Sequence, residues 1–193
     1  MDDKVIVTNR AAMLRKYGAK GVAAVEKALK ALLSADGKRG IRSRVVFLDD
    51  AATMKKLKGK PVTNASDPRQ AKAAVDAVFR ALDPDYLMIL GAPDVVPHQD
   101  LKNLAGDDDA VAWGDLPYAC EAPYSRNPET FIGPTRVVGR MPDLSGAREP
   151  SYLLGLLRTA AGYERRPQQD IHPRDPVGPR AIDDGREHRL QRG

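Results

Sequence analysis

Short β-rich runs alternate with amphipathic helical segments along the first part of this chain. Runs at 4–8, 44–48, 86–90 and 135–139 are apolar and rich in β-branched residues, as strands are. The run at 86–90 shows no polar alternation, which suits a strand buried on both faces of a parallel sheet. This alternation predicts an α/β fold, with a mostly parallel sheet of about four strands flanked by helices on both faces.

Helical spacing of apolar residues fills the segments between these runs. The clearest case lies between Asp67, a good N-cap residue, and Leu82, with Pro68 at the favoured first position. Shorter or weaker patterns predict further helices at 10–17, 20–33, 51–57 and 150–163. Gly18 separates the first two of them.

Two other segments lack this periodicity. Residues 91–134 are rich in Pro, Gly, Asp and Asn, so we expect a long loop region there. From Glu164 onward, Arg and Pro dominate, and only isolated apolar residues remain. Such a segment cannot bury enough apolar surface to offset the entropy of ordering it. We therefore expect one α/β domain at 1–163 and a disordered tail at 164–193.

The cysteine content and the length of the apolar runs indicate in which cellular compartment the protein is expected. Cys120 is the single cysteine of 193 residues, which excludes an internal disulfide and a cysteine-based zinc site. The start of the chain lacks the basic and then apolar pattern of a secretory signal, and no apolar run reaches the roughly 18 residues of a membrane helix. We expect a cytoplasmic protein without a membrane-spanning segment.

Positive charge is concentrated at the front of the chain. The net charge is +5, but residues 1–60 contain fifteen Lys or Arg against six Asp or Glu. Such a region attracts acidic partners or nucleic acid. The scarcity of aromatic residues there argues against single-stranded nucleic acid. The alternative is that these cations only solvate the outer faces of helices.

The candidate chemical groups lie mostly after the third predicted strand. Ligands of parallel sheets bind beyond the carboxyl ends of the strands, where Asn9, Asp49 and Arg140 are expected. A cysteine nucleophile needs a base within hydrogen-bond reach, and Cys120 with His98 is the one Cys/His pairing that we consider. The alternative is a structural cysteine and an unrelated loop histidine.

Asp107, Asp108 and Asp109 form a run of carboxylates, the oxygen ligands that calcium prefers. Their spacing is not that of an EF-hand loop, so a solvated acidic turn is the competing interpretation. The glycine-rich fingerprints of nucleotide sites are absent from the sequence. We predict no organic cofactor.

Three strings together resemble the gingipain-like cysteine peptidases, a caspase-fold family. Asp85–Pro97 reads DYLMILGAPDVVP and is similar to the family's apolar strand followed by Gly-x-x-Asp-x-apolar-Pro. Asp115–Ala119 is similar to its Asp-x-x-Tyr segment, and Val137–Pro142 to its VGRxP segment. The resemblance covers about residues 4–163. It implies a caspase-like three-layer sandwich and a family of cysteine endopeptidases, in which calcium binding recurs.

The resemblance ends before the family's chemistry. The family's catalytic histidine precedes a glycine, whereas His98, His172 and His188 precede Gln, Pro and Arg. No cysteine follows Cys120, which precedes the family's nucleophile position. The resemblance therefore implies an incomplete sandwich and a truncated or frameshifted relative.

Three functional hypotheses follow from the sequence. The first is a catalytically incomplete peptidase relative that acts as a scaffold, with a protein partner covering an open edge of its sheet. The second is an interaction module whose basic front region binds an acidic partner or nucleic acid. The third is an active cysteine hydrolase that uses Cys120 and His98.

Overall fold

The sheet has four parallel strands, as predicted. The computed structural model describes residues 2–164, so the predicted disorder of the tail lies outside the described residues apart from Glu164. The strands are β1 (Lys4–Thr8), β2 (Ser43–Phe47), β3 (Tyr86–Leu90) and β6 (Val138–Met141), in the order β2-β1-β3-β6. All three neighbouring pairs are parallel.

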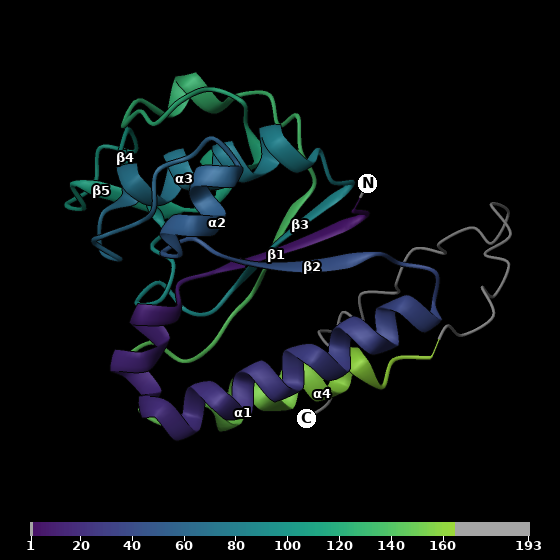
Figure 1. Ribbon diagram of the computed structural model, residues 1–193. Helices are drawn as coiled ribbons and strands as arrows, with labels where there is room; N and C mark the ends of the chain where they lie inside the picture. Colours follow the sequence, from purple (N-terminus) through teal and green to yellow (C-terminus); the bar gives the residue numbers. More distant parts are fainter. Residues whose placement is uncertain (1, 165–193) are drawn as a thin grey trace, which may run out of the picture. The chain divides into compact units, whose positions relative to one another are not determined.

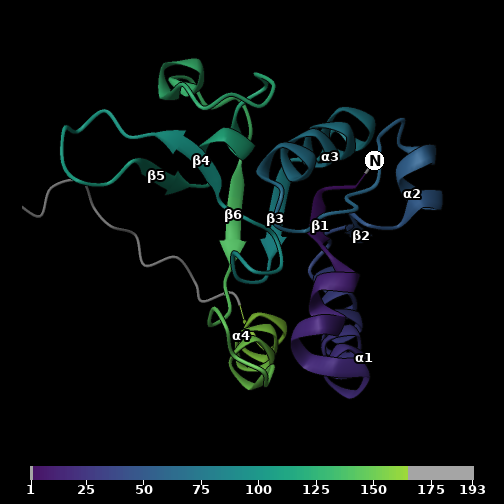
Figure 2. The ribbon, with the colours of Figure 1, turned by 90° about the vertical axis from the view of Figure 1, so that its left-hand side faces the viewer.

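Helices cover both faces of this sheet and complete three layers. Helices α1 (Arg10–Lys38) and α4 (Ser151–Ala161) pack side by side below the sheet in the view of Figure 1. Helices α2 (Ala51–Lys56) and α3 (Pro68–Leu82) lie above it, and Figure 2 shows the same layering from the side. The α/β prediction is therefore confirmed.

Helix α1 contains the break that the sequence predicted. Gly18 has φ +67° and ψ 176°, a conformation that glycine adopts without strain, and the helix continues beyond it. The second segment ends at Lys38 rather than at residue 33. The last turn is held by polar contacts, because the buried Asp36 accepts a hydrogen bond from Ser43 and pairs with Lys4 and Arg39. An apolar pattern cannot reveal such a turn.

The N-terminal caps follow local chemistry. Asp67 accepts from the backbone N–H groups of Arg69 and Gln70 at 2.9 and 3.2 Å, which confirms it as the N-cap of α3. Asn9 caps α1 and Asp50 caps α2 in the same manner.

Regular structure occurs within the segment predicted as a long loop. Strands β4 (Gln99–Lys102) and β5 (Val111–Gly114) form an antiparallel pair, and two 3₁₀ turns follow at Leu116–Ala119 and Pro128–Phe131. Four-residue strands with polar residues give too short a pattern to detect. Strand β6 also begins three residues later than predicted. Thr135 and Arg136 instead donate their N–H groups to the carbonyl of Ala119.

One main core joins the three layers. Strand residues Val5, Ile6, Val7 and Ile89 are fully buried, and α1, α3 and α4 each contribute apolar side chains to the same cluster. No helix between residues 2 and 164 has both the length and the apolar character needed to cross a membrane.

Candidate functional site

The sheet reverses its strand order between β1 and β3. Ligands of doubly wound sheets usually bind at this point, beyond the carboxyl ends of the strands. Here Asp49 occupies the amino end of α1, accepting from the N–H groups of Arg10 and Ala11 at 2.7 and 2.8 Å. Thr8 donates its hydroxyl to the carbonyl of Leu90 at 2.9 Å. The protein's own groups thus satisfy a helix terminus that would otherwise suit an anion.

Arg140 fills the neighbouring part of this edge. Its Nε and Nη2 donate to the two carboxylate oxygens of Asp115, both at 2.6 Å. Its Nη1 donates to the carbonyls of Gly91 and Val96 at 2.8 and 2.9 Å. A bidentate pair with two further bonds uses nearly all the donors of a guanidinium. Arg140 therefore holds the exit of β3 and has little capacity left for a ligand.

Two further residues of the three resembling strings, Tyr118 and Asp94, also form hydrogen bonds within the protein. The buried Tyr118 hydroxyl donates to the Pro97 carbonyl at 2.7 Å. Asp94 accepts from Lys16 Nζ at 2.7 and 2.8 Å and from the N–H of Gly146 at 2.9 Å. The three strings are thus connected around the exits of β3 and β6. The sequence analysis did not identify Lys16 as a partner of Asp94, because no local pattern indicates that its side chain is buried.

His98 lies beside the Arg140 pair. Its Nδ1 is 2.9 Å from Asp115 Oδ1, and its Nε2 has no hydrogen-bond partner among the described residues. Burial tends to raise the pKa of Asp115, but the bonds from Arg140 and His98 outweigh it, so the pKa lies below its ordinary value. This geometry orients an imidazole, but no hydroxyl or thiol of the described residues is hydrogen-bonded to it.

Cys120 lies in a separate small cluster with Leu101 and Phe131. Its Sγ is 3.7 Å from the carbonyl of Phe131, and the residue is buried. Burial raises the pKa of the thiol, although Lys72 and Arg136 partly oppose this. An activated nucleophile needs the opposite shift. Within residues 2–164, the structure does not join Cys120 and His98 by a hydrogen bond.

The three aspartates lie on the turn between β4 and β5. Asp107 accepts from the Asn103 side-chain amide at 2.5 Å and from the N–H of Asp109 at 3.1 Å, which closes the turn. All three aspartates are exposed. Among residues 2–164 no group of three or more His, Cys, Asp or Glu side chains is arranged to hold a metal ion. Calcium binding stays a prediction.

A buried charge network links α3 to the loop that follows β5. Lys72 Nζ is 2.6 Å from both carboxylate oxygens of Asp76 and 3.1 Å from the Cys120 carbonyl. Arg136 Nη1 is 2.5 Å from the same carboxylate, and its guanidinium lies 4.4 Å from the centre of the Phe79 ring. These contacts fix the loop. The sequence analysis missed them because Lys72 and Asp76 look like surface residues of an amphipathic helix.

Strand β2 leaves hydrogen-bonding groups at an open edge of the sheet. Lys4 donates to the Arg42 carbonyl at 3.1 Å, and Leu48 donates to the Thr8 carbonyl at 2.8 Å. Bonds of a parallel ladder recur at every second residue, so the even-numbered residues of β2 face β1. The backbone groups of Ser43 and Val45, and the N–H of Phe47, therefore point away from the sheet.

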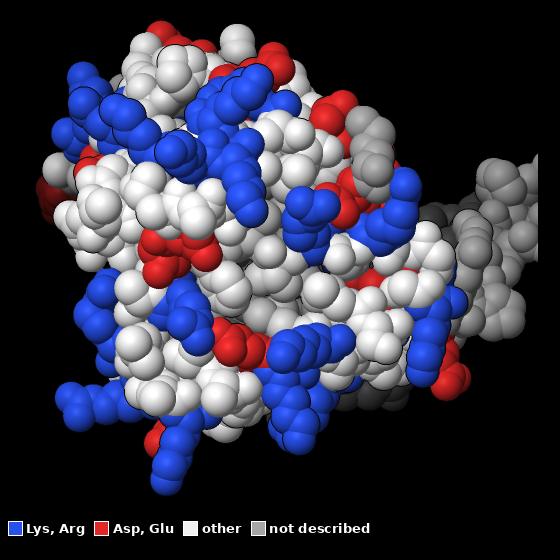
Figure 3. All heavy atoms as spheres, in the orientation of Figure 1, with Lys and Arg blue, Asp and Glu red and all other residues white. Residues whose placement is uncertain are grey.

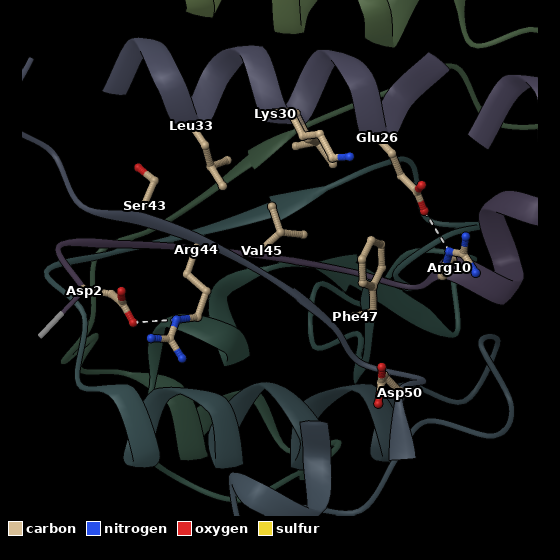
Figure 4. Close-up of a pocket in the computed structure, with 11 residues that line it drawn as sticks. Asp2, Arg10, Glu26, Lys30, Leu33, Ser43, Arg44, Val45, Phe47 and Asp50 are labelled. Carbon is tan, nitrogen blue, oxygen red and sulfur yellow. Dashed lines mark hydrogen bonds and ion pairs between the residues drawn. The ribbon is translucent and has the colours of Figure 1, made fainter. Parts of the chain in front are cut away.

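A groove runs along this edge between β2 and α1. Its volume is about 750 Å³, and it is lined by residues of both elements and of their neighbours (Figure 4). Val45 and Phe47 point toward α1, with Phe47 near its Glu26 end, whereas Arg44 points to the opposite side and pairs with Asp2 at 2.8 Å. The α1 side of the groove therefore combines the apolar Leu33 with Lys30 and with Glu26, which pairs with Arg10 at 2.7 Å. The other side is charged.

Cations flank the same edge. Figure 3 shows Lys and Arg side chains gathered over α2 and over α1, and between them an uncharged surface interrupted by a few Asp and Glu side chains. The exposed lysines of these elements include Lys27 and Lys30 of α1, and Lys55, Lys56, Lys58 and Lys60 in and after α2. None of these six forms an ion pair within the described part of the chain. They leave positive charge available to a partner.

Comparison of the chain with protein-family models, curated proteins and solved structures gives no match. The resemblance to gingipain-like peptidases therefore stays a prediction from the sequence.

Proposed function

We propose that residues 2–164 form a protein-interaction domain that binds an acidic partner on the face containing the open edge of β2. The observation that carries this proposal is the groove of about 750 Å³ beside β2, flanked by lysines without ion-pair partners in the described chain. Attraction from such a surface speeds encounter with an acidic partner and selects against basic ones.

The carboxyl edge of the sheet supports the same proposal. There Arg140, Asp115 and Asp49 form hydrogen bonds with the protein's own backbone and side chains, which leaves them little capacity to bind a ligand. The Cys120 thiol is buried with a raised pKa. We therefore favour a scaffold role, that of a catalytically incomplete gingipain-like domain, over the cysteine hydrolase that uses Cys120 and His98.

Fluorescence anisotropy tests the proposal. A labelled peptide of alternating Val and Asp is expected to bind. Its affinity is expected to fall at least about tenfold between roughly 50 and 200 mM salt, because added ions screen the attraction between exposed charges. The double variant Lys27→Glu, Lys30→Glu is expected to weaken binding at least tenfold. Lys102→Glu is the matched control, since Lys102 is an exposed, unpaired lysine of the described residues on the separate β4–β5 pair.

Two outcomes contradict the proposal. Binding that is equal for the acidic peptide and for a peptide of alternating Val and Lys would show that the surface does not select charge. Binding of duplex or single-stranded DNA in place of the acidic peptide would identify a nucleic-acid surface instead.

A further inference from the structure

Among residues 2–164 no strand pairs with the outer side of β2, so this edge has the chemistry of a strand that lacks a neighbour. Ser43 and Val45 each direct an N–H and a carbonyl outward, and Phe47 directs an N–H outward. The Phe47 carbonyl already accepts a hydrogen bond from the N–H of Asp50 at 3.1 Å, so the series of outward-facing backbone groups ends at the N–H of Phe47. Five consecutive outward groups match the hydrogen-bonding pattern of one further short strand.

The two sides of this edge differ in chemistry. An added strand would direct alternate side chains toward α1 and toward the α2–α3 layer. On the α1 side they would meet the apolar Leu33, Val45 and Phe47, with Lys30 and the paired Glu26 beside them. On the opposite side they would meet Arg44, which is about half exposed at 52% although it pairs with Asp2, and Asp50 at the far end. The best complement is a segment whose residues alternate between apolar and acidic.

We infer that an extended segment of the acidic partner, with alternating apolar and acidic residues, binds as a fifth strand beside β2. This inference rests on the proposed function and specifies its binding mode. Backbone bonds to Ser43, Val45 and Phe47 provide affinity, and the groove beside α1 selects apolar side chains. The lysines of α1 and of the segment around α2 attract the acidic residues.

A second copy of this chain is a poorer occupant of the same edge. An antiparallel pair of β2 strands centred on Val45 places both Arg44 side chains on one face, in diagonal positions. It also brings the lysines of one copy toward those of the other. Like charges oppose this arrangement. An acidic segment meets no such repulsion.

Backbone N-methylation of the Val/Asp peptide tests the inference without altering the protein. One nonapeptide has methyl groups on the N–H groups of its valines, and a second has them on those of its aspartates. In an added strand one set of N–H groups faces β2 and the other faces solvent. One methylated peptide is therefore expected to bind within about threefold of the parent, and the other at least tenfold more weakly. Equal affinity of the two would overturn strand addition.

A pair of protein variants gives an independent test. Val45→Pro removes an outward N–H and blocks pairing, yet proline is tolerated in an edge strand when its nitrogen faces solvent. Val45→Thr keeps the N–H. We expect a tenfold or greater loss of peptide affinity for Val45→Pro and less than twofold for Val45→Thr, with circular dichroism verifying the fold of each.

The outcomes separate the inference from the proposed function. If both variants and both methylated peptides bind in a salt-dependent manner with unchanged affinity, the acidic partner stands and strand addition is wrong. If no acidic peptide binds at all, the proposed function is wrong as well. Self-association of the protein that Val45→Pro abolishes, seen by sedimentation, would assign the edge to a second copy and overturn the inference.

Discussion

Asp76→Asn removes the single negative charge of the buried network between α3 and the loop after β5. Lys72 and Arg136 approach this carboxylate at 2.6 and 2.5 Å. Both cationic side chains are 0% exposed, and the carboxylate is 5% exposed. The variant leaves two positive charges buried beside a neutral amide. Removing one partner of a buried pair costs about 3–5 kcal/mol of unfolding free energy, and we expect a loss in that range.

Urea unfolding followed by circular dichroism measures this loss. With a slope of about 1–3 kcal/mol per molar urea, the midpoint falls by about 2 M. Asp83→Asn is the matched control, because Asp83 is exposed and its left-handed conformation suits asparagine. The control is expected to change stability by less than about 0.5 kcal/mol. A loss below about 1 kcal/mol for Asp76→Asn would refute the view that the Asp76 carboxylate stabilises two buried cations.

The pH dependence gives a second readout of the same network. Burial lowers the pKa of Lys72, and the Asp76 carboxylate partly offsets this. Between the lowered pKa and the ordinary value of 10.5, the unfolded chain binds a proton that the folded chain does not, so stability rises with pH in this window. Without Asp76 the offset is lost. The rise is then expected to begin at a lower pH than in the parent protein.

Further predictions concern the exits of β3 and the cysteine. Arg140→Gln is expected to destabilise the fold by about 2–4 kcal/mol, since it removes the guanidinium that donates to Asp115 and to two carbonyls. The lowered pKa of Asp115 stabilises the fold above the ordinary carboxyl pKa, and this contribution disappears as pH falls through the folded value. In acid titration the variant is expected to lose the larger part of this contribution, which comes from Arg140, and an unchanged acid limb would contradict the pairing. Gly91 has φ +112°, and a Cβ added there would lie 2.9 Å from the Val95 side chain. Gly91→Ala is therefore expected to lower the free energy of unfolding by at least about 1–3 kcal/mol, measured by thermal unfolding, and a neutral effect would contradict the tight turn. Iodoacetamide is expected to label Cys120 slowly, with an apparent pKa above the ordinary value that His98→Ala leaves unchanged; fast labelling that depends on His98 would restore the hydrolase hypothesis.

The strands were predictable because both of their faces are buried, and the main helices because their apolar residues repeat at the spacing of one buried face. Val5–Val7 and Leu87–Leu90 are apolar without interruption, and the stripe of α3 is regular, so local pattern and tertiary burial agree. The break at Gly18 was predictable for a similar reason, since glycine alone accepts its conformation without strain.

The buried polar contacts were not predictable in the same way. Lys72 and Asp76 occur four residues apart on a helix, a spacing that usually marks a solvated ion pair. Their burial depends on Arg136, sixty residues later along the chain. Arg140 was correctly expected at the carboxyl edge, but its use as a structural clamp depends on where Asp115 lies. The β2 groove likewise requires knowledge of which strand ends the sheet.

Amide hydrogen exchange of β2, resolved by NMR, tests the central claim most directly. Addition of the Val/Asp peptide is expected to slow exchange at the outward N–H groups of Val45 and Phe47. The N–H groups of Arg44 and Val46 already face β1, and their exchange is expected to change little. Slowed exchange in this alternating pattern is the result that the account predicts. Binding that leaves Val45 and Phe47 unchanged, or that protects the far edge strand β6 instead, would contradict it.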